Sequence, residues 1–320
     1  MQQFIRERVE LNELYRTLMM RHKVVVNIPS RGLYGKQMRR IFIAGPGKKV
    51  LGCDGSGLEL RMLAHFMDDP AYQEVILSGD IHTHNQNLAG LSKRDQAKVF
   101  IYAYLYGSGI PNLARQLGLD LHTVEQAVAK FKRDLPKLTD LLKRVEKAAS
   151  TFGYMLAVDG RWGRVRSKGG DLLLHTALNV LLQMTGSLVM KWGHVFAEDY
   201  AFEEGVIPSV DLFPLIAHVH DEAQMEIDAE EVTVMQYAVL ASEWKREEKE
   251  QVEDERGIWS APSKTNIPAV EGEEYIVVQR QFHKLGDIYC RAIREAGLFL
   301  KLRCPCAGEY KIGDSWLDTH

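Results

Sequence analysis

The 320-residue sequence lacks the features that mark secreted and membrane proteins. It has only four cysteines, and none of them stands in a C-x-x-C pair, so neither a disulfide framework nor a structural zinc site is expected. No apolar run approaches the ~18 residues that a membrane-spanning helix needs. The first residues, MQQFIRERVE, are polar and lack the apolar core of a signal peptide. We therefore expect a cytoplasmic protein with reduced thiols.

The charges are segregated along the chain although the net charge is only −3. Residues 14–53 contain nine Lys or Arg and no Asp or Glu, whereas residues 243–255 carry seven acids against three bases. This distribution indicates a basic face for a polyanion and a solvated acidic segment elsewhere, and the alternative is an accident of surface composition. Since 46% of the residues are hydrophobic and the length suits roughly two domains, packed cores are expected.

Hydrophobic periodicity predicts an α+β fold with a helical block between the first strand and the later ones. A short apolar strand, KKVLGCD, ends at Asp54, and the segments LFPLIAHV and AQMEI predict a later hairpin. A further hairpin is expected at VDGRWGRVRS, and a final strand at 298–304. The expected helices cover residues 4–20, 58–67, 93–106 with Ser92 as N-cap, 123–145 with a kink at Pro136, 172–200, 229–248 and 277–296.

Two aspartates stand at the ends of short apolar strands. His220, Asp221 and Glu222 lie together at the tip of the hairpin IAHVHDEAQMEI, and Asp54 is followed by Gly55. Two carboxylates together with phosphate oxygens bind Mg²⁺ well, and two such ions ~3.5–4 Å apart serve in-line displacement at phosphorus. The pattern therefore predicts that the two carboxylates meet at one sheet edge, and the alternative is that each aspartate only caps a turn.

The predicted helix 93–106 carries a stripe of cations and aromatic rings. Arg94, Lys98, Tyr102 and Tyr106 follow one another at intervals of four, so they lie on one slowly winding face. Arg94 and Tyr102 are about 12 Å apart along the axis, close to the length of an extended triphosphate with its sugar. The stripe thus suits phosphates followed by a sugar and a base. The alternative is a solvated basic edge with two core tyrosines.

Three segments, in order, resemble the motifs of the family A DNA polymerases, the bacterial polymerase I type. DGSGLELR at 54–61 resembles motif A, RDQAKVFIYAYLYG at 94–107 resembles motif B, and VHDE at 219–222 resembles motif C. The likeness is strongest to the replicative polymerases of short-tailed phages. These share the sequence SGLELR at 56–61, GDIHT at 79–83 and a final histidine, here His320. It runs from about Asn27 to the C-terminus and is interrupted near 245–278.

The resemblance implies a role for each matching residue. Asp54 and Asp221 would be catalytic metal ligands with help from the Gly55 carbonyl, and Lys98 would protonate the pyrophosphate leaving group. The residues that would bind the incoming dNTP are His82, Arg94, Lys98, Tyr102, Glu59 as the steric gate against a 2′-hydroxyl, and Tyr106 at the nascent base pair. The residues that would contact primer and template are Arg161, Arg166, Asn179, Gln183, His220 and Glu222.

The resemblance also implies a right-hand architecture, in which a palm of antiparallel sheet and helices carries helical fingers. Residues 1–79 would form an N-terminal helix and the first part of the palm, 80–157 the fingers, and 158–320 the rest of the palm with a charged insertion near 245–278. The chain begins 53 residues before Asp54 and has no Thr-Gly-Arg motif. We therefore expect the C-terminal half of a split polymerase without exonuclease domain or thumb, complemented by a second polypeptide that docks on helix 4–20.

The function implied is a DNA-directed DNA polymerase that transfers dNTPs to a primer 3′-hydroxyl, with two Mg²⁺ ions as cofactors and Mn²⁺ as a substitute. Its partners would be primer–template DNA and dNTPs. Two alternatives remain open, namely a non-catalytic DNA-binding remnant and a relative of the single-subunit RNA polymerases. Glu59, together with Tyr102 and Tyr106, favours the DNA enzyme over the latter.

Overall fold

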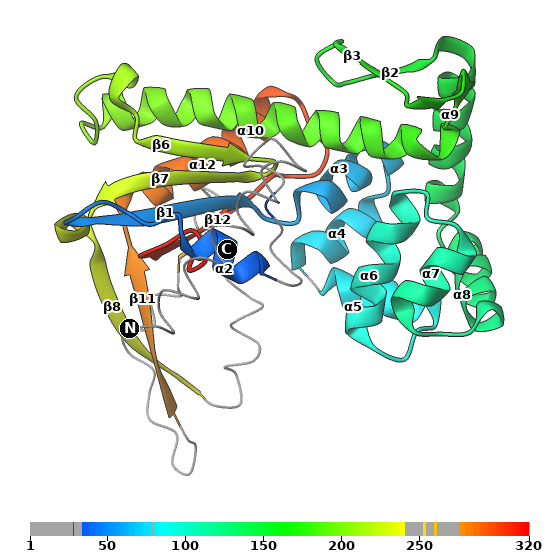
Figure 1. Cartoon of the computed structure of the whole chain (residues 1–320), viewed down its shortest axis with the longest axis horizontal. Coiled ribbons are helices and arrows are strands. Elements are labelled where there is room, and N and C mark those ends of the chain that lie inside the picture. Colours follow the sequence, from blue (N-terminus) through cyan, green and yellow to red (C-terminus); the bar gives the residue numbers. More distant parts are fainter. Residues whose placement is uncertain are drawn as a thin grey trace, which may run out of the picture. The chain divides into compact units, whose positions relative to one another are not determined.

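The computed structural model describes residues 28, 34–78, 80–240, 252–253, 259–260 and 275–319 (Figure 1). The expected helix 4–20, His320 and most of the charged segment 245–278 lie outside these residues. The chain forms two compact units. The first, which we call the sheet unit, comprises Met1–Ser56, Met190–Ala296 and Cys306–His320; the second, the helical unit, comprises Gly57–Val189 and Gly297–Pro305. These bounds differ from the expected 1–79, 80–157 and 158–320, because the chain leaves the sheet directly after the first strand.

The sheet unit is built on four antiparallel strands in the order β12-β1-β7-β6. These are β1 (Lys48–Gly55), β6 (Leu215–Val219), β7 (Glu222–Asp228) and β12 (Gly308–Gly313). The central strand β1 is buried continuously from Val50 to Cys53 rather than at alternate positions, as expected for a strand covered on both faces. Gly52 is required there, because a Cβ atom would lie 2.5 Å from the Gln224 amide and 2.7 Å from Thr319.

Helix α12 (Lys284–Phe299) packs on this sheet and on the second half of α10 (Ala177–Glu203). Gly308 of β12 lies against Cys290 and Ile293 of α12, and a Cβ atom added to Gly193 of α10 would lie 3.3 Å from Ile293. A second apolar cluster joins Met38 of the short helix α2 (Gly35–Arg40) to Val219 and Trp316. The strand that carries Asp54 is thus held by apolar packing.

The helical unit consists mainly of helices around an aromatic core. Phe100, Tyr104 and Phe131 contact one another with ring centroids 5.3–5.8 Å apart. The helices are α3 (Leu58–Met67), α4 (Pro70–Ser78), α5 (Ile81–Ala89), α6 (Arg94–Leu105), α7 (Ile110–Leu117), α8 (Leu121–Asp134), α9 (Pro136–Phe152) and the first half of α10. Two small hairpins, β2 (Tyr154–Leu156) with β3 (Trp162–Arg164) and β4 (Ser167–Lys168) with β5 (Asp171–Leu172), lead into η2 (Leu174–Thr176).

Several expected elements were wrong in type or bounds. The kinked helix 123–145 is two helices, because Pro136 begins α9 and has no N–H with which to continue α8. Lys93 rather than Ser92 is the N-cap of α6. The final strand expected at 298–304 is the end of α12 and the loop after it. The last strand of the chain is instead β12, which pairs with β1 at one edge of the sheet.

The segment expected as helix 229–248 begins instead as η4 (Ala229–Glu231) and β8 (Thr233–Leu240). Strand β8 pairs antiparallel with β11 (Tyr275–Phe282), which replaces the start of the helix expected from 277. Residues with high strand propensity, such as those of TVMQYAVL, favour this pairing once a partner strand is present. Two further short strands, β9 (Val252–Glu253) and β10 (Trp259–Ser260), pair with each other, and η3 (Val210–Leu212) precedes β6.

The overall class is mixed helix and sheet, as the sequence predicts. All four cysteines are buried thiols. Within the described residues, none of the helices is both long enough and apolar enough to span a membrane.

Candidate functional site

In the sheet unit, strand pairing brings Asp54 and Asp221 together. Asp54 is the penultimate residue of β1 and lies opposite Glu222 of β7, and the Gly55 N–H donates to the Asp221 carbonyl over 2.9 Å. Asp221 stands in the two-residue turn that joins β6 to β7. The juxtaposition that the sequence predicts is therefore present, and Gly55 adjoins both aspartates.

The charge around Asp54 is strongly negative. Burial, followed by the carboxylates of Asp221, Glu309 and Glu222, raises the pKa of Asp54 to about 8, against a smaller opposing effect of Lys311. Hard oxygen donors gathered in this way fit Mg²⁺. In the described part of the chain, no group of three or more His, Cys, Asp or Glu side chains is arranged to hold a metal ion alone. The two aspartates would therefore need oxygens from water or a phosphate to complete the coordination.

His220 occupies a strained position in the same turn. Its φ of 57° lies in the left-handed region, which few non-glycine residues adopt and which is frequent at functional sites. The side chain is exposed, and Val219 pairs with Glu222 to close the turn. His220 is thus available to a ligand at the tip that carries Asp221.

Glu222 differs from its expected role as a primer contact, because its side chain is buried. Its carboxylate accepts a hydrogen bond of 2.6 Å from the Trp316 indole and a short one from Gln224, and it pairs with Arg39 over 3.5 Å. The Arg39 guanidinium also lies 4.3 Å from the Trp316 ring centroid. Glu222 is therefore a positioning residue that fixes the start of β7. No local pattern signals this contact, since Arg39 and Trp316 are far from Glu222 along the chain.

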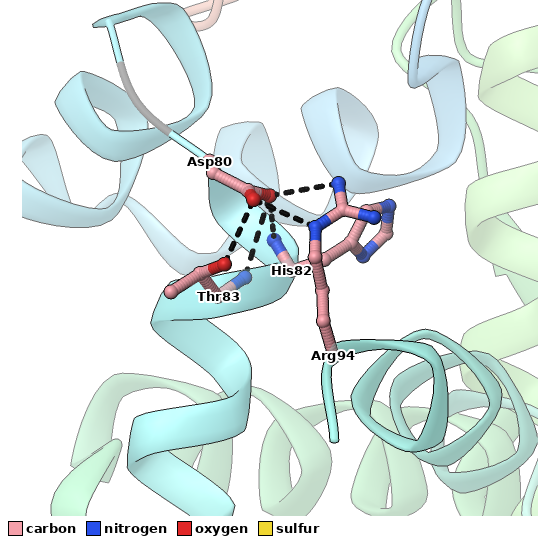
Figure 2. A network of polar contacts seen from close by, with 4 residues as sticks. All are labelled: Asp80, His82, Thr83 and Arg94. Atoms are coloured by element: carbon pink, nitrogen blue, oxygen red, sulfur yellow. Dashed lines mark hydrogen bonds and ion pairs between the residues drawn. The ribbon is translucent and has the colours of Figure 1, made fainter. Parts of the chain in front are cut away.

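In the helical unit, Asp80 holds Arg94 in the arrangement that Figure 2 shows. Its two carboxylate oxygens accept from Nε and Nη2 of Arg94, at 2.7 and 3.0 Å. The same carboxylate caps α5 by accepting from the backbone N–H groups of His82 and Thr83. Sequence reasoning missed Asp80 as a site residue, although the Asp-x-x-Thr pattern in GDIHT signals a helix cap.

Two substitutions at Asp80 separate its roles. Asn caps helices as well as Asp but carries no charge, so Asp80→Asn keeps an oxygen for the backbone N–H groups of His82 and Thr83 while it loses the ion pair with Arg94 and the acceptor of the Thr83 hydroxyl. We expect it to lower the free energy of unfolding by less than about 1 kcal/mol. Asp80→Ala removes the cap too and is expected to cost about 1–2 kcal/mol. Urea-induced unfolding of both variants checks this order. Equal losses would show that the cap contributes nothing.

His82 lies beside the cations of α6. Burial, and then the charges of Arg94 and Lys98, lower the pKa of His82 to about 4. Its Nδ1 is buried and has no hydrogen-bond partner among the described residues, and its ring centroid is 6.3 Å from that of Tyr102. The structure thus brings His82, Arg94, Lys98 and Tyr102 to one place, where an anion would find two cations and an imidazole nitrogen that still needs a partner.

The lowered pKa of His82 predicts a pH dependence of stability. Between pH 6.5, its ordinary value, and about 4, the unfolded chain binds a proton that the folded protein does not, so stability falls as pH falls through this window. His82→Gln is expected to make the free energy of unfolding less pH-dependent there. The control His122→Gln, at an exposed position on α8, is expected to leave the profile unchanged. Superimposable profiles of His82→Gln and the wild type would contradict the assignment.

Glu59, Tyr106 and Gln183 form a second polar group in the helical unit. The Tyr106 hydroxyl donates to a Glu59 carboxylate oxygen over 2.8 Å. Burial and then the Glu59 charge raise the pKa of Tyr106, while a hydrogen bond with Gln183 opposes the rise. Asn179, one turn before Gln183 on α10, has a buried Oδ1 without a hydrogen-bond partner in the described part of the chain. The predicted sugar, base and minor-groove residues are therefore neighbours.

Arg161 lies in the loop of the β2–β3 hairpin, and Arg166 lies two residues after β3. Arg161 donates to Asp159 over 2.7 Å in the hairpin loop, and Arg166 is exposed just after β3. Both side chains are exposed and accessible to a polyanion.

Comparison with known proteins decides the family. Residues 17–253 match the sequence profile described as DNA polymerase family A. The chain belongs to DNA polymerase family A. All three motifs of this family A chain, with Asp54, Arg94 and Asp221, fall inside the matched range.

Curated relatives of the family A chain include phage enzymes. It is 28% identical to the DNA-directed DNA polymerase of Escherichia phage Phieco32 over 95% of this chain and 54% of that protein. It is 35% identical to the DNA-directed DNA polymerase of Escherichia phage T7 over 67% of this chain and 34% of that protein. The chain thus spans between a third and about half of the length of these relatives.

The fold of the family A chain is similar to that of a solved polymerase domain. The POL domain of Pol1 from M. smegmatis, in complex with DNA primer-template and dNTP, aligns with a TM-score of 0.64 at 19% identity. The alignment covers 92% of this chain and 44% of that one. The mixed helix and sheet architecture is therefore that of a family A polymerase domain.

Proposed function

We propose that this family A chain catalyses template-directed DNA synthesis, adding deoxynucleotides to a primer 3′-hydroxyl. The observation that carries the proposal is the meeting of Asp54 and Asp221 at one end of β1 and β7. The electrostatics agree, since a site that disfavours its own negative charge has most to gain from a cation. The curated phage relatives are named as DNA-directed DNA polymerases.

Asp54, Asp221 and the Gly55 carbonyl would hold two Mg²⁺ ions, for which Mn²⁺ is a substitute. When bound, such ions lower the pKa of an attacking hydroxyl and neutralise charge on the phosphates. The protein's own residues contribute by holding the metal ligands in position. The paired strands fix the two carboxylates, and the Glu222 network with Trp316 and Arg39 fixes the start of β7.

Arg94, Lys98 and His82 would bind the triphosphate. Asp80 uses Nε and Nη2 of Arg94, which leaves Nη1 for a ligand. In the reaction, the primer 3′-oxygen loses its proton and bonds to the α-phosphorus, while the bond from that phosphorus to the bridging oxygen breaks. Lys98 would donate a proton to the departing pyrophosphate oxygen. The buried Nδ1 of His82, unsatisfied within the described residues, suits a phosphate contact.

Tyr102 would lie against the incoming sugar, Glu59 would exclude a 2′-hydroxyl, and Tyr106 would stack at the nascent base pair. The hydrogen bond from Tyr106 to Glu59 supports the gate, because it holds the Glu59 carboxylate in one position. Asn179 and Gln183 would read the minor groove, while Arg161, Arg166 and His220 would contact primer and template. The complementing polypeptide with thumb and exonuclease stays a prediction from the sequence.

Primer extension tests the function. Folded protein that binds primer–template is supplied with Mg²⁺ and either dNTPs or rNTPs, alone and with the product of the adjacent upstream reading frame. Extension with dNTPs is expected. Binding without extension in both settings would favour the DNA-binding remnant, and preferential use of rNTPs would favour the RNA polymerase relative.

A further inference from the structure

The β2–β3 hairpin and the helix end beside it expose an apolar surface that the described part of the helical unit leaves uncovered. Phe152 is 62% exposed, Leu156 56% and Trp162 68%, and Tyr154 is 36% exposed. Single exposed apolar residues are ordinary, but four in one short stretch of surface, one of them a tryptophan, mark a binding surface. We call these four residues the hairpin face.

The rings of the hairpin face form a continuous row. Phe152 and Tyr154 have ring centroids 5.9 Å apart, as do Tyr154 and Trp162. Leu156 lies directly opposite Trp162 in the strand register. The ladder between β2 and β3 fixes the backbone positions from which Tyr154 and Trp162 project, and Phe152 adjoins them at the end of α9.

The other face of the hairpin is anchored, so the exposure of the rings is not a sign of loose packing. Met155 and Val165 are buried. Gly163 lies against α10, where an added Cβ would be 2.9 Å from the sulfur of Met184 and 3.1 Å from Val180. The strand alternation then directs Tyr154, Leu156 and Trp162 outward.

Cations surround the hairpin face. Arg164 lies directly opposite Tyr154 in the register, and Arg166 and Lys168 follow within four residues. All three are exposed. Asp159 is the only acid between residues 151 and 170, and its carboxylate is bonded to Arg161. A protein partner with an apolar surface would have to desolvate these charges, whereas a polyanion with flat apolar groups complements both features.

We propose that the hairpin face is a stacking platform for single-stranded DNA, in which successive bases stack on Trp162 and Tyr154 while Arg164 and Arg166 contact the phosphates. Exposed aromatic rings beside cations are how proteins bind single strands without reading their sequence. The site lies outside the residues proposed for catalysis and dNTP binding, and it shares Arg166 with the residues proposed to contact primer and template. Only the choice of DNA over RNA rests on the proposed function.

The test measures the affinity of the full chain for a fluorescein-labelled oligothymidylate by fluorescence anisotropy. Trp162→Ala is expected to weaken binding about five- to 100-fold, and Trp162→Phe, which keeps a stacking ring, less than about threefold. Arg164→Ala is expected to make the slope of log K against log salt shallower by about 0.7, whereas Trp162→Ala leaves the slope unchanged. The matched control is Phe202→Ala, a comparably exposed ring on α10 outside the hairpin, which is expected to bind as the wild type.

Wild-type affinity in Trp162→Ala, with circular dichroism showing a folded protein, would overturn the proposal and leave the hairpin face to a protein partner. Equal loss in Trp162→Ala and Phe202→Ala would overturn it as well. The two proposals can fail separately. If the chain does not extend a primer but its binding of the oligothymidylate depends on Trp162, the polymerase proposal fails and the stacking platform stands.

Discussion

Replacing Asp54 by asparagine is expected to abolish primer extension while making the metal-free protein more stable. The neutral amide of Asp54→Asn cannot act as an anionic ligand, and a divalent ion contributes several kcal/mol to the stabilisation of the transition state. The rate of nucleotide addition is therefore expected to fall on the order of 10³-fold or more. Without metal, burial and the carboxylates of Asp221, Glu309 and Glu222 raise the pKa of Asp54 to about 8, so near neutral pH folding forces this carboxyl to take up a proton, and the neutral amide avoids that cost. A gain of about 0.5–2 kcal/mol in the free energy of unfolding follows.

Glu309→Gln is the matched control for this prediction. Glu309 lies opposite Asp54 on β12 and also contributes to the negative charge there, but it is not a proposed ligand. We expect a smaller gain in stability and extension at close to the wild-type rate. Thermal unfolding with and without Mg²⁺ completes the comparison, because the ion is expected to stabilise the wild type and not Asp54→Asn. Equal stabilisation of both proteins would place the ion elsewhere.

Removing Arg39 is expected to cost about 3–5 kcal/mol of folding stability, because Arg39→Met leaves a buried carboxylate without its counter-charge. The side chains of Arg39 and Glu222 are only 6% and 4% exposed. Burial lowers the pKa of Arg39, but the charge of Glu222 and its hydrogen bond oppose this effect. We therefore still expect the loss of stability. Trp316 still donates its indole N–H, which is why Glu222 is not left wholly unsatisfied.

A double-mutant cycle isolates this pair. Glu222→Gln keeps an acceptor for the Trp316 indole while removing the charge, and the variant with both Arg39→Met and Glu222→Gln retains neither charge of the pair. We expect the double variant to be more stable than Arg39→Met alone. Urea-induced unfolding of the four proteins measures the coupling. Additive losses would show that the two residues do not interact.

The sequence predicts most of what brings Asp54 to Asp221. Both aspartates end short apolar strands, and β1 and β7 are held together by backbone hydrogen bonds that depend little on distant side chains. The stripe on α6 follows for a similar reason, since helical periodicity is local and the positions 94, 98 and 102 must share a face.

The features that the sequence does not predict depend on residues that are distant along the chain. Residues 229–248 have helical spacing when taken alone, and only the presence of β11 makes the start of this segment a strand. Likewise, Glu222 in VHDE has the composition of an exposed turn residue. Its burial is possible because Trp316 and Arg39, from opposite ends of the chain, supply a donor and a charge. Asp80 has a local capping signal, but its contact with Arg94 requires α5 and α6 to be packed together.

The most direct test of the central proposal is single-nucleotide incorporation on four primer–templates that differ only in the first unpaired template base. With Mg²⁺, the wild-type protein is predicted to add the complementary deoxynucleotide in each case, and Asp54→Asn and Asp221→Asn are predicted to add none. Incorporation that ignores the template base, or that persists in both variants, would contradict the account.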